Sequence, residues 1–203
     1  MHCLVTAGPT IEPIDEVRRL TNHSTGRLGC SLADTLSREG HRVTLLLSEV
    51  ALHIPRSKKV RIIRFSTTQN LGEHLKAASE LKIKAVFHAA AVSDFFIKKP
   101  KKGKISSSKE ITLHLKPSPK LIRNLRKCYP DAFLVGWKYE VSGDRKSAVD
   151  SAKQQINRCK TNLCVANGPA YGNGFGVVSD EVIHCVNDRS LFRVLIKQVT
   201  SPR

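Results

Sequence analysis

Short, nearly continuous apolar runs alternate along this chain with longer segments of helical periodicity. Strands that are apolar along their whole length are typical of a parallel sheet with helices on both faces. Right-handed crossovers between such strands predict an α/β fold with a Rossmann-like, doubly wound, mostly parallel sheet. Ligands bind beyond the carboxyl ends of the strands in this architecture. The loops after Ala7, Val92, Tyr139 and Val165 are therefore expected to share one functional edge.

The apolar and turn patterns also place the individual elements. Ser24 or Thr25 is the expected cap of the first helix, which Gly40 ends. The tail from Val177 is expected to form a hairpin, and 191–199 fits either a strand or a helix. Strands are predicted at 3–7, 42–48, 60–66, 85–92, 110–116, 133–139 and 162–167, and helices at 24–39, 67–82, 119–128 and 144–160.

The chain has 203 residues, enough for one domain with its own core. We expect a single domain over 1–203 with a C-terminal hairpin. The domain also carries an irregular basic flap at about 97–116. No apolar run approaches the roughly 20 residues of a membrane span. The N-terminus also lacks the features of a signal peptide. A cytoplasmic protein without a membrane partner is therefore expected.

Six cysteines and eight histidines are present, but their spacing is not that of metal ligands. No two cysteines form a C-x-x-C pair. Cys3, Cys30, Cys164 and Cys185 lie in apolar surroundings, where a reduced cysteine behaves as a small core residue. We therefore expect no metal site built by the protein alone.

The charge balance is strongly basic. Thirty-four Lys and Arg residues against 17 Asp and Glu residues give a formal net charge of +17. Such a chain attracts polyanions, among them nucleic acids and small phosphorylated substrates. Only 5% of the residues are aromatic, which leaves little for base stacking and weighs against a dedicated nucleic-acid protein.

The long first loop, 8–23, separates the first strand from its helix. The dinucleotide fingerprint G-x-G-x-x-G, which directly follows the first strand in dehydrogenases, is missing. The helix starts instead at S-T-G-R-L-G, where free N–H groups can hold a phosphate. Gly26 permits close approach of a ligand and Gly29 permits close packing of helix on strand. An ordinary NAD-dependent dehydrogenase is therefore not expected.

Four polar residues near these loops are candidates for chemistry. Asn22 offers an amide to a carbonyl or phosphoryl oxygen, although it could equally be a helix cap. Arg18 suits a bidentate phosphate contact or an ordinary surface position. Asp94 ends an apolar strand and could hold a base, a ribose or a metal, or simply cap a turn. Lys104, in the loop G-K-I-S-S-S, can stabilise charge in nucleotidyl transfer.

Several segments together resemble one enzyme family. V-T-A-G-P-T-I-E-P-I-D-E-V-R-R-L-T-N-H-S-T-G-R-L-G closely resembles the opening motif of phosphopantothenoylcysteine synthetase, or phosphopantothenate–cysteine ligase. H-A-A-A-V-S-D-F resembles its second motif, and G-K-I-S-S-S with E-I-T-L-H-L-K-P-S-P-K-L-I resembles its flap. V-G-W-K-Y-E and L-C-V-A-N resemble later family motifs, so the match runs from Val5 to Gly176 in order.

The resemblance implies a ligase that acts in coenzyme A biosynthesis. It would join L-cysteine to 4'-phosphopantothenate through an acyl-nucleotide intermediate, using CTP or ATP with Mg²⁺ as cofactor. By resemblance, Asn22 and Lys104 are the catalytic residues. The substrate-binding positions are Arg18, Gly8, Ser24, Gly26, Ala90 and Ala91, and the nucleotide-binding positions are Asp94, Phe133, Trp137 and Lys138.

Some features depart from the family pattern. Trp137 stands where Phe is usual, and Lys120 where an acidic residue is common. The stretch after Phe175 lacks the expected acidic and Asn residues, so a degenerate nucleotide-binding member remains an alternative, as does a basic nucleic-acid-binding Rossmann-like protein. The resemblance also implies a homodimer, and 95–116 is its expected interface because this segment leaves the core and returns. Met1 lies only two residues before the first strand, so a stand-alone synthetase is expected.

Overall fold

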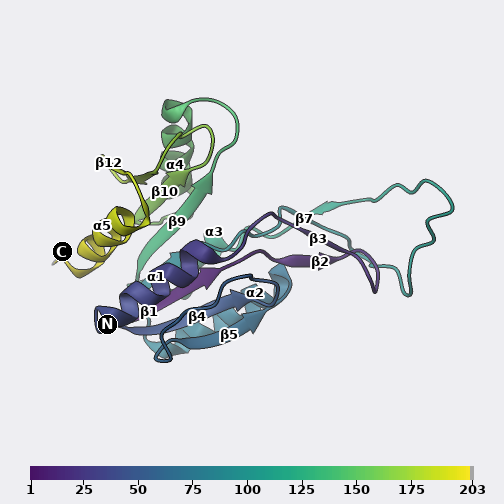
Figure 1. Cartoon of the computed structure of the whole chain (residues 1–203), viewed down its shortest axis with the longest axis horizontal. Coiled ribbons are helices and arrows are strands. Elements are labelled where there is room, and N and C mark those ends of the chain that lie inside the picture. The colour runs from purple at the N-terminus through teal and green to yellow at the C-terminus, as the bar shows by residue number, and fades with distance from the viewer. Residues whose placement is uncertain (202–203) are drawn as a thin grey trace.

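The computed structural model describes residues 1–201 and has an eight-stranded sheet at its centre (Figure 1). The strand order is β12-β11-β10-β9-β6-β1-β4-β5, and the six strands from β10 to β5 run parallel. β11 and β12 close one side as an antiparallel hairpin. The strands of this sheet are β1 (His2–Ala7), β4 (Arg42–Ser48), β5 (Arg61–Phe65), β6 (Ala85–His88), β9 (Phe133–Tyr139), β10 (Leu163–Asn167), β11 (Phe175–Val178) and β12 (Val182–Cys185).

Helices cover both faces of the sheet. On one face α1 (Arg27–Arg38) and α5 (Asp188–Thr200) pack on a core that includes Val5, Leu45 and Val135. Successive side chains of a strand point to opposite faces. Leu4, Leu46 and Leu134 therefore form the core of the second face. That face is covered by α2 (Thr68–Ala77), α3 (Ile122–Cys128) and α4 (Arg145–Cys159), and the short helix η1 (Ala78–Leu81) follows α2.

This architecture confirms the predicted fold class: a mostly parallel, Rossmann-like α/β sheet with a C-terminal hairpin. The predicted core cysteines are buried, and 191–199 is helical within α5. Among residues 1–201, no helix is both long and apolar enough to cross a bilayer.

Three local predictions are wrong. The segment 110–116 is not a strand, since only β8 (Lys116–Pro117) pairs, with β7 (Phe95–Phe96). β6 ends at His88 rather than at Val92, because backbone bonds bend the chain from Ala89 onwards. The first helix begins after Gly26, a left-handed residue with no side-chain cap, instead of after Ser24 or Thr25.

The long loop 8–23 contains an unexpected hairpin. β2 (Ile11–Pro13) and β3 (Arg19–Thr21) pair antiparallel, with 14–18 at the tip. The hairpin projects from the sheet beside the irregular segment 97–115, and the two together form an extended arm (Figure 1). After this excursion the chain returns to its starting point. A Cβ atom on Gly26 would lie 3.5 Å from the Cα atom of Gly8.

A buried histidine links the sheet to the first of these loops. The Thr6 hydroxyl accepts the Ala90 N–H (3.0 Å) and lies 3.1 Å from His88 Nδ1. The tautomer of His88 decides which of these two groups donates. Burial lowers the pKa of His88 from 6.5 to about 4, since the charged ring would lose its hydration.

The lowered pKa predicts a pH-dependent stability. The unfolded chain binds a proton on His88 that the native chain does not, so stability falls as pH drops from about 6.5 toward 4. At about 1.4 kcal/mol per pKa unit, His88 costs about 2 kcal/mol of unfolding free energy between pH 7 and 5. Urea denaturation at both pH values should show that His88→Gln reduces the wild-type loss by this amount. The exposed control His114→Gln should not change it. A His88→Gln protein with the wild-type pH dependence would contradict this account.

Candidate active site

The loops after β1 and β6 are joined by backbone hydrogen bonds at the carboxyl edge of the sheet. The Ala91 N–H donates to the Gly8 carbonyl (3.0 Å), and the Thr10 N–H donates to the Ala91 carbonyl (3.2 Å). Gly8 has φ +85°, and a Cβ atom there would lie 2.7 Å from the Ser48 Cβ atom. Glycine is therefore required at this turn for both its conformation and its size. The structure brings together Gly8, Ala90 and Ala91, as the sequence predicted.

Asn22 lies directly against this junction. Its amide nitrogen donates to the Val92 carbonyl (3.0 Å) and approaches the Ala91 carbonyl (3.4 Å), 69 residues further along the chain. Asn22 is nevertheless exposed, so its side chain is oriented by the loop and accessible to a ligand. This contact excludes the alternative that Asn22 merely caps α1, whose N-cap is Gly26.

The N-terminus of α1 opens beside the same junction. Gly26 is buried next to Gly8, and Ser24 is half-buried just before it. Gly26 supplies no side-chain cap to α1, whose first turn contains no acidic residue. The free N–H groups and the positive end of the helix dipole therefore suit an anionic group such as a phosphate.

A buried polar network supports the junction from the protein interior. This network was not predicted from the sequence. The Glu12 carboxylate accepts bonds from the Thr68 N–H (2.8 Å) and the Thr68 hydroxyl (2.7 Å), which fixes the start of α2. Thr10 Oγ1 accepts the Ser93 N–H (2.9 Å) and lies 3.1 Å from Thr68 Oγ1. These four residues are nearly inaccessible to solvent. Thr10, Glu12 and Ser93 lie inside the two motif segments, whereas Thr68 lies outside both, so no local pattern linked the four.

Arg18 lies at the tip of the arm and contacts the flap. Its guanidinium donates to Asp15 Oδ2 (2.8 Å) and to the Ile105 carbonyl (3.0 Å). The buried Asp15 carboxylate also accepts N–H groups from Ile105, Val17 and Arg18. The bond from the Ile105 N–H, followed by those from Arg18 and Val17 and by the Arg18 charge, holds the pKa of Asp15 well below its usual range despite burial.

Lys104 immediately precedes Ile105, so it also lies at the arm tip, with an exposed side chain. The Lys101 N–H donates to the Ile14 carbonyl (3.1 Å), which ties the flap to the hairpin at a second point. β3 separates this tip from Asn22. Four residues of extended chain span about 13 Å. The structure therefore does not bring Arg18 and Lys104 to Asn22 within one chain.

The predicted nucleotide-side residues lie at both ends of β9. Gly136 pairs with His88, so Trp137 and Lys138 extend from the carboxyl edge. Phe133 pairs with Ala85 at the other end of the strand, so the structure does not bring it to this edge. Lys138 Nζ lies 3.1 Å from Glu140 Oε1.

Asp94 and Trp137 differ in their exposure and in their polar partners. The exposed Asp94 carboxylate forms an ion pair with Lys120, the residue that departs from the family pattern. Its backbone carbonyl accepts the Ser118 N–H (2.8 Å) at the base of the flap. The indole N–H of Trp137 is buried and has no hydrogen-bond partner among residues 1–201.

The edge continues into a shallow hollow of about 570 Å³ beyond β9 and β10. Tyr139, Asn167 and Phe175 line it, together with the intervening loop, in which Gly168, Gly172 and Gly174 have positive φ. This hollow was not predicted from the sequence, because its lining residues come from separate loops that meet only in the fold.

The carboxylates of this region do not form a metal cage. Within residues 1–201, no three His, Cys, Asp or Glu side chains cluster as metal ligands. Glu12 and Asp15 are occupied by hydrogen bonds, and Asp94 is paired with Lys120. Mg²⁺ commonly binds through one or two carboxylates together with substrate phosphates. These residues therefore fit a magnesium ion that is held mainly by a nucleotide, with Asp94 as the exposed carboxylate at this edge.

The fold and this edge define a Rossmann-like α/β domain with a glycine-lined carboxyl edge and a projecting basic arm. A family model described as the DNA/pantothenate metabolism flavoprotein C-terminal domain matches residues 1–198. The chain belongs to this family.

Curated relatives and a solved structure are consistent with this family assignment. The chain is 35% identical over 183 residues to the coenzyme A biosynthesis bifunctional protein CoaBC of Thermococcus kodakarensis, covering 89% of this chain and 43% of that protein. It is 32% identical over 164 residues to the protein of the same name from Methanocaldococcus jannaschii, covering 81% and 40%. The chain thus spans less than half the length of these relatives. The DNA/pantothenate metabolism flavoprotein from Streptococcus pneumoniae superposes with a TM-score of 0.88 at 26% identity, covering 98% of both chains.

The Asp15 contacts predict that one carboxylate anchors the flap. Asp15→Asn should release the Ile105 N–H, because one carboxylate oxygen is replaced by a donor, and trypsin should then cleave faster at the flap lysines. Since the pKa of Asp15 is depressed, its stabilising effect is present above about pH 3.9 and is lost as pH falls further. Asp144→Asn, at the N-cap of α4, is the matched control, since Asn also caps helices. Equal flap cleavage in the Asp15 and Asp144 variants would refute the anchor.

Proposed function

We propose that this chain is a phosphopantothenate–cysteine ligase of coenzyme A biosynthesis. The observation that carries the proposal is the Asn22 contact, which joins the first and second family-like motifs of the sequence at one carboxyl edge. The names of the curated relatives agree with a role in this pathway.

The reaction proceeds in two steps. A carboxylate oxygen of 4'-phosphopantothenate attacks the α-phosphorus of CTP or ATP, and the bond from that phosphorus to the bridging oxygen breaks, which releases pyrophosphate. The amine of cysteine then attacks the acyl carbon and loses a proton. The bond from the acyl carbon to the nucleotide oxygen breaks, and the nucleoside monophosphate leaves with both electrons.

The carboxyl edge supplies the contacts that these steps need. The N-terminus of α1 holds a phosphate through free N–H groups, and Gly8 and Gly26 permit close approach of the backbone. Asn22, oriented by the Ala91–Val92 carbonyls, holds the acyl-nucleotide while cysteine attacks. Mg²⁺, when bound with the nucleotide, neutralises charge on the triphosphate.

The arm supplies Arg18 and Lys104, and its tip lies about 13 Å of extended chain from Asn22. We propose a homodimer in which the arm forms the interface. Ile111, Leu113 and Leu115 alternate along the flap, and all three are more than two-fifths exposed. Monomeric proteins rarely leave such a contiguous apolar row in water.

Pyrophosphate release separates the proposal from its alternatives. We expect release with CTP or ATP only when phosphopantothenate is present, and amide product only when cysteine is added. Nucleotide binding without release would favour the degenerate alternative, which the departures after Phe175 suggest. Testing the two nucleotides separately decides which base is used.

Two variants should fail at different steps. Lys104→Gln should slow acyl-nucleotide formation by about 10²–10³, the usual cost of losing one contact to developing charge. Asn22→Asp places a negative charge beside an anionic intermediate, so it should release about one pyrophosphate per site yet form little amide. Labelled phosphopantothenate would show accumulated intermediate only with the Asn22 variant. Lys102→Gln, on the same flap, is the control with near wild-type rates. Failure of both variants at one step would refute this division of roles.

The dimer has its own test. Leu113→Asp should shift the sedimenting species to monomer, because it places a charge in the apolar row. Val182→Asp is the matched control, at a similarly exposed residue on β12 (43% against 41% exposed). A wild-type chain that sediments only as monomer at micromolar concentration would overturn the dimer.

A further inference from the structure

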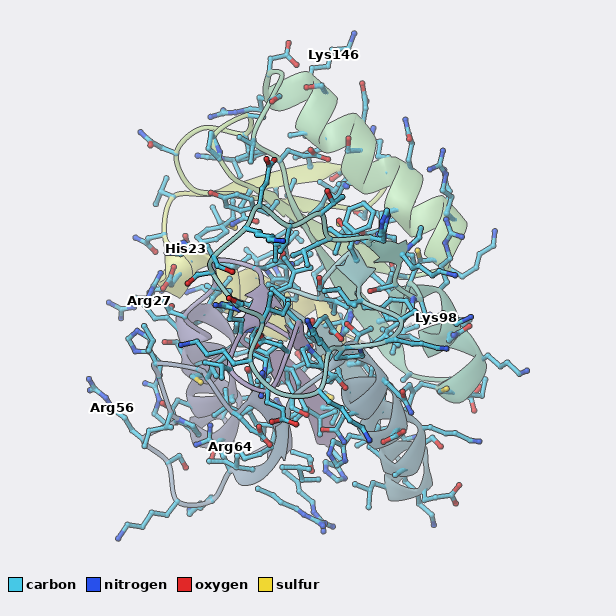
Figure 2. All side chains as sticks on the ribbon, turned by 90° about the vertical axis from the view of Figure 1, so that its right-hand side faces the viewer. His23, Arg27, Arg56, Arg64, Lys98 and Lys146 are labelled. Atoms are coloured by element: carbon cyan, nitrogen blue, oxygen red, sulfur yellow. The ribbon has the colours of Figure 1, made fainter. Side chains whose placement is uncertain are left out.

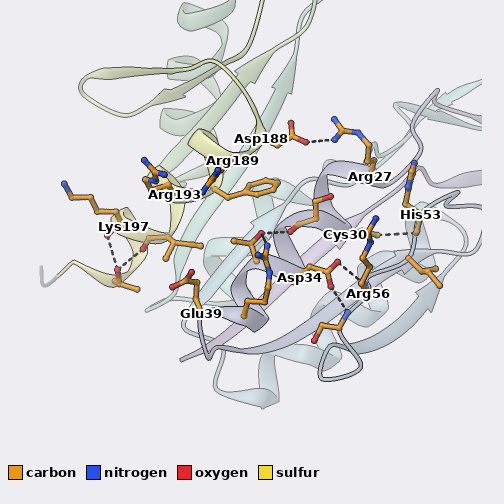
Figure 3. Close-up of a pocket in the computed structure, with 18 residues that line it drawn as sticks. Arg27, Cys30, Asp34, Glu39, His53, Arg56, Asp188, Arg189, Arg193 and Lys197 are labelled. Atoms are coloured by element: carbon orange, nitrogen blue, oxygen red, sulfur yellow. Dashed lines mark hydrogen bonds and ion pairs between the residues drawn. The ribbon is translucent and has the colours of Figure 1, made fainter.

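A second depression extends from the start of α1 at the carboxyl edge along the side of the molecule. It is a groove of about 1450 Å³ between α1, α5 and the segment 53–57, on the face opposite α2, α3 and α4 (Figure 3). None of the residues assigned above to substrate or nucleotide lines it. The ligase chemistry therefore leaves this groove unexplained.

The groove carries an excess of positive charge. Six lining side chains are cationic and three are carboxylates, an excess of three. Two of the carboxylates are already engaged. Asp188 pairs with Arg27, and Asp34 accepts the backbone N–H groups of Arg56 and Ser57 (both 2.9 Å). The remaining cations are Arg38, Arg56, Arg189, Arg193 and Lys197.

The cations of α5 form a row. Arg189, Arg193 and Lys197 recur every four residues, so they share one face of the helix over about 12 Å. All three are exposed, and none has an ion-pair partner within residues 1–201. Figure 3 shows their side chains along the groove, with Arg27 and Arg56 on the other side. Cations on both walls fit a linear anion better than a single compact one.

The groove offers phosphate contacts but no surface for stacking bases. Its one Phe, Tyr or Trp side chain, Phe192, is only 5% exposed. The groove is bounded by α1, α5 and the segment 53–57, so a chain of phosphates laid in it would meet cations from both walls. Arg27 and Arg56, which line the wall opposite α5, lie along one side of the molecule in Figure 2. Small anionic substrates do not require a formal net charge of +17, whereas a polyanion would be attracted by it.

We propose that this basic groove, between α1 and α5, binds single-stranded nucleic acid through its phosphates, without reading base sequence. Each neutralised phosphate releases counterions, so affinity should fall steeply as salt is raised. The binding goes beyond the proposed ligase function and does not depend on it.

The test measures fluorescence anisotropy of a labelled oligouridylate of about 20 nucleotides over a series of salt concentrations. The triple variant Arg189→Gln/Arg193→Gln/Lys197→Gln should lower the slope of log affinity against log salt by about 2, since each lost contact contributes about 0.7. It should keep ligase activity, because these residues lie outside the carboxyl edge. The charge-conserving variant Arg189→Lys/Arg193→Lys/Lys197→Arg should retain binding.

The matched control is Lys146→Gln/Lys153→Gln/Arg158→Gln on α4, which removes the same charge from three exposed residues on the opposite face. It should leave the slope nearly unchanged. Equal weakening by both triple variants would overturn the groove as a site and indicate only attraction by net charge. Loss of binding from Lys98→Gln/Lys99→Gln/Lys102→Gln alone would assign the nucleic acid to the flap instead. Absence of wild-type binding at low salt would also overturn the proposal.

Discussion

The candidate site depends on one short piece of backbone pairing, in which the loops after β1 and β6 bind each other through Gly8, Thr10 and Ala91. This pairing converts two separate strand ends into a single surface. The exposed Asn22 side chain binds this surface from the solvent side, and the buried Glu12–Thr68–Thr10–Ser93 network holds it from the protein interior. Because the supporting groups are buried, removing one would leave others without partners, which costs more than the lost bond itself.

The arm is held together by different interactions from those of the carboxyl edge. It has few buried apolar residues, so its tip is held by polar contacts, chiefly those of the Asp15 carboxylate. Asp15 joins the hairpin to the flap and also pairs with Arg18, so one residue orients both basic elements. The resulting geometry separates Arg18 and Lys104 from Asn22 within one chain. This separation supports the proposed homodimer, in which the arm of one chain would meet the Asn22 site of the other.

Much of the fold was predictable because apolar runs and helical periodicity are local properties. The parallel strands, the flanking helices and the C-terminal hairpin were all expected. The errors arose where local pattern and tertiary contact disagree. The alternation of Ile111, Leu113 and Leu115 is typical of a strand, but no strand within residues 1–201 pairs with it. Gly26 starts α1 because its left-handed backbone lets the chain return to Gly8, a requirement that capping preferences do not include.

The sequence by itself determined the fold class, the family resemblance and the identity of the residues in its motifs, because these are properties of order along the chain. Tertiary structure decided which of those residues meet. Asn22, Gly8 and Ala91 are brought together, whereas Phe133 lies at the other end of its strand and Lys104 at the end of an arm. Only the packing of α1 against α5 could show that cations far apart in sequence line one groove. Side chains separated by more than a hundred residues become neighbours through chain topology, which no local pattern specifies.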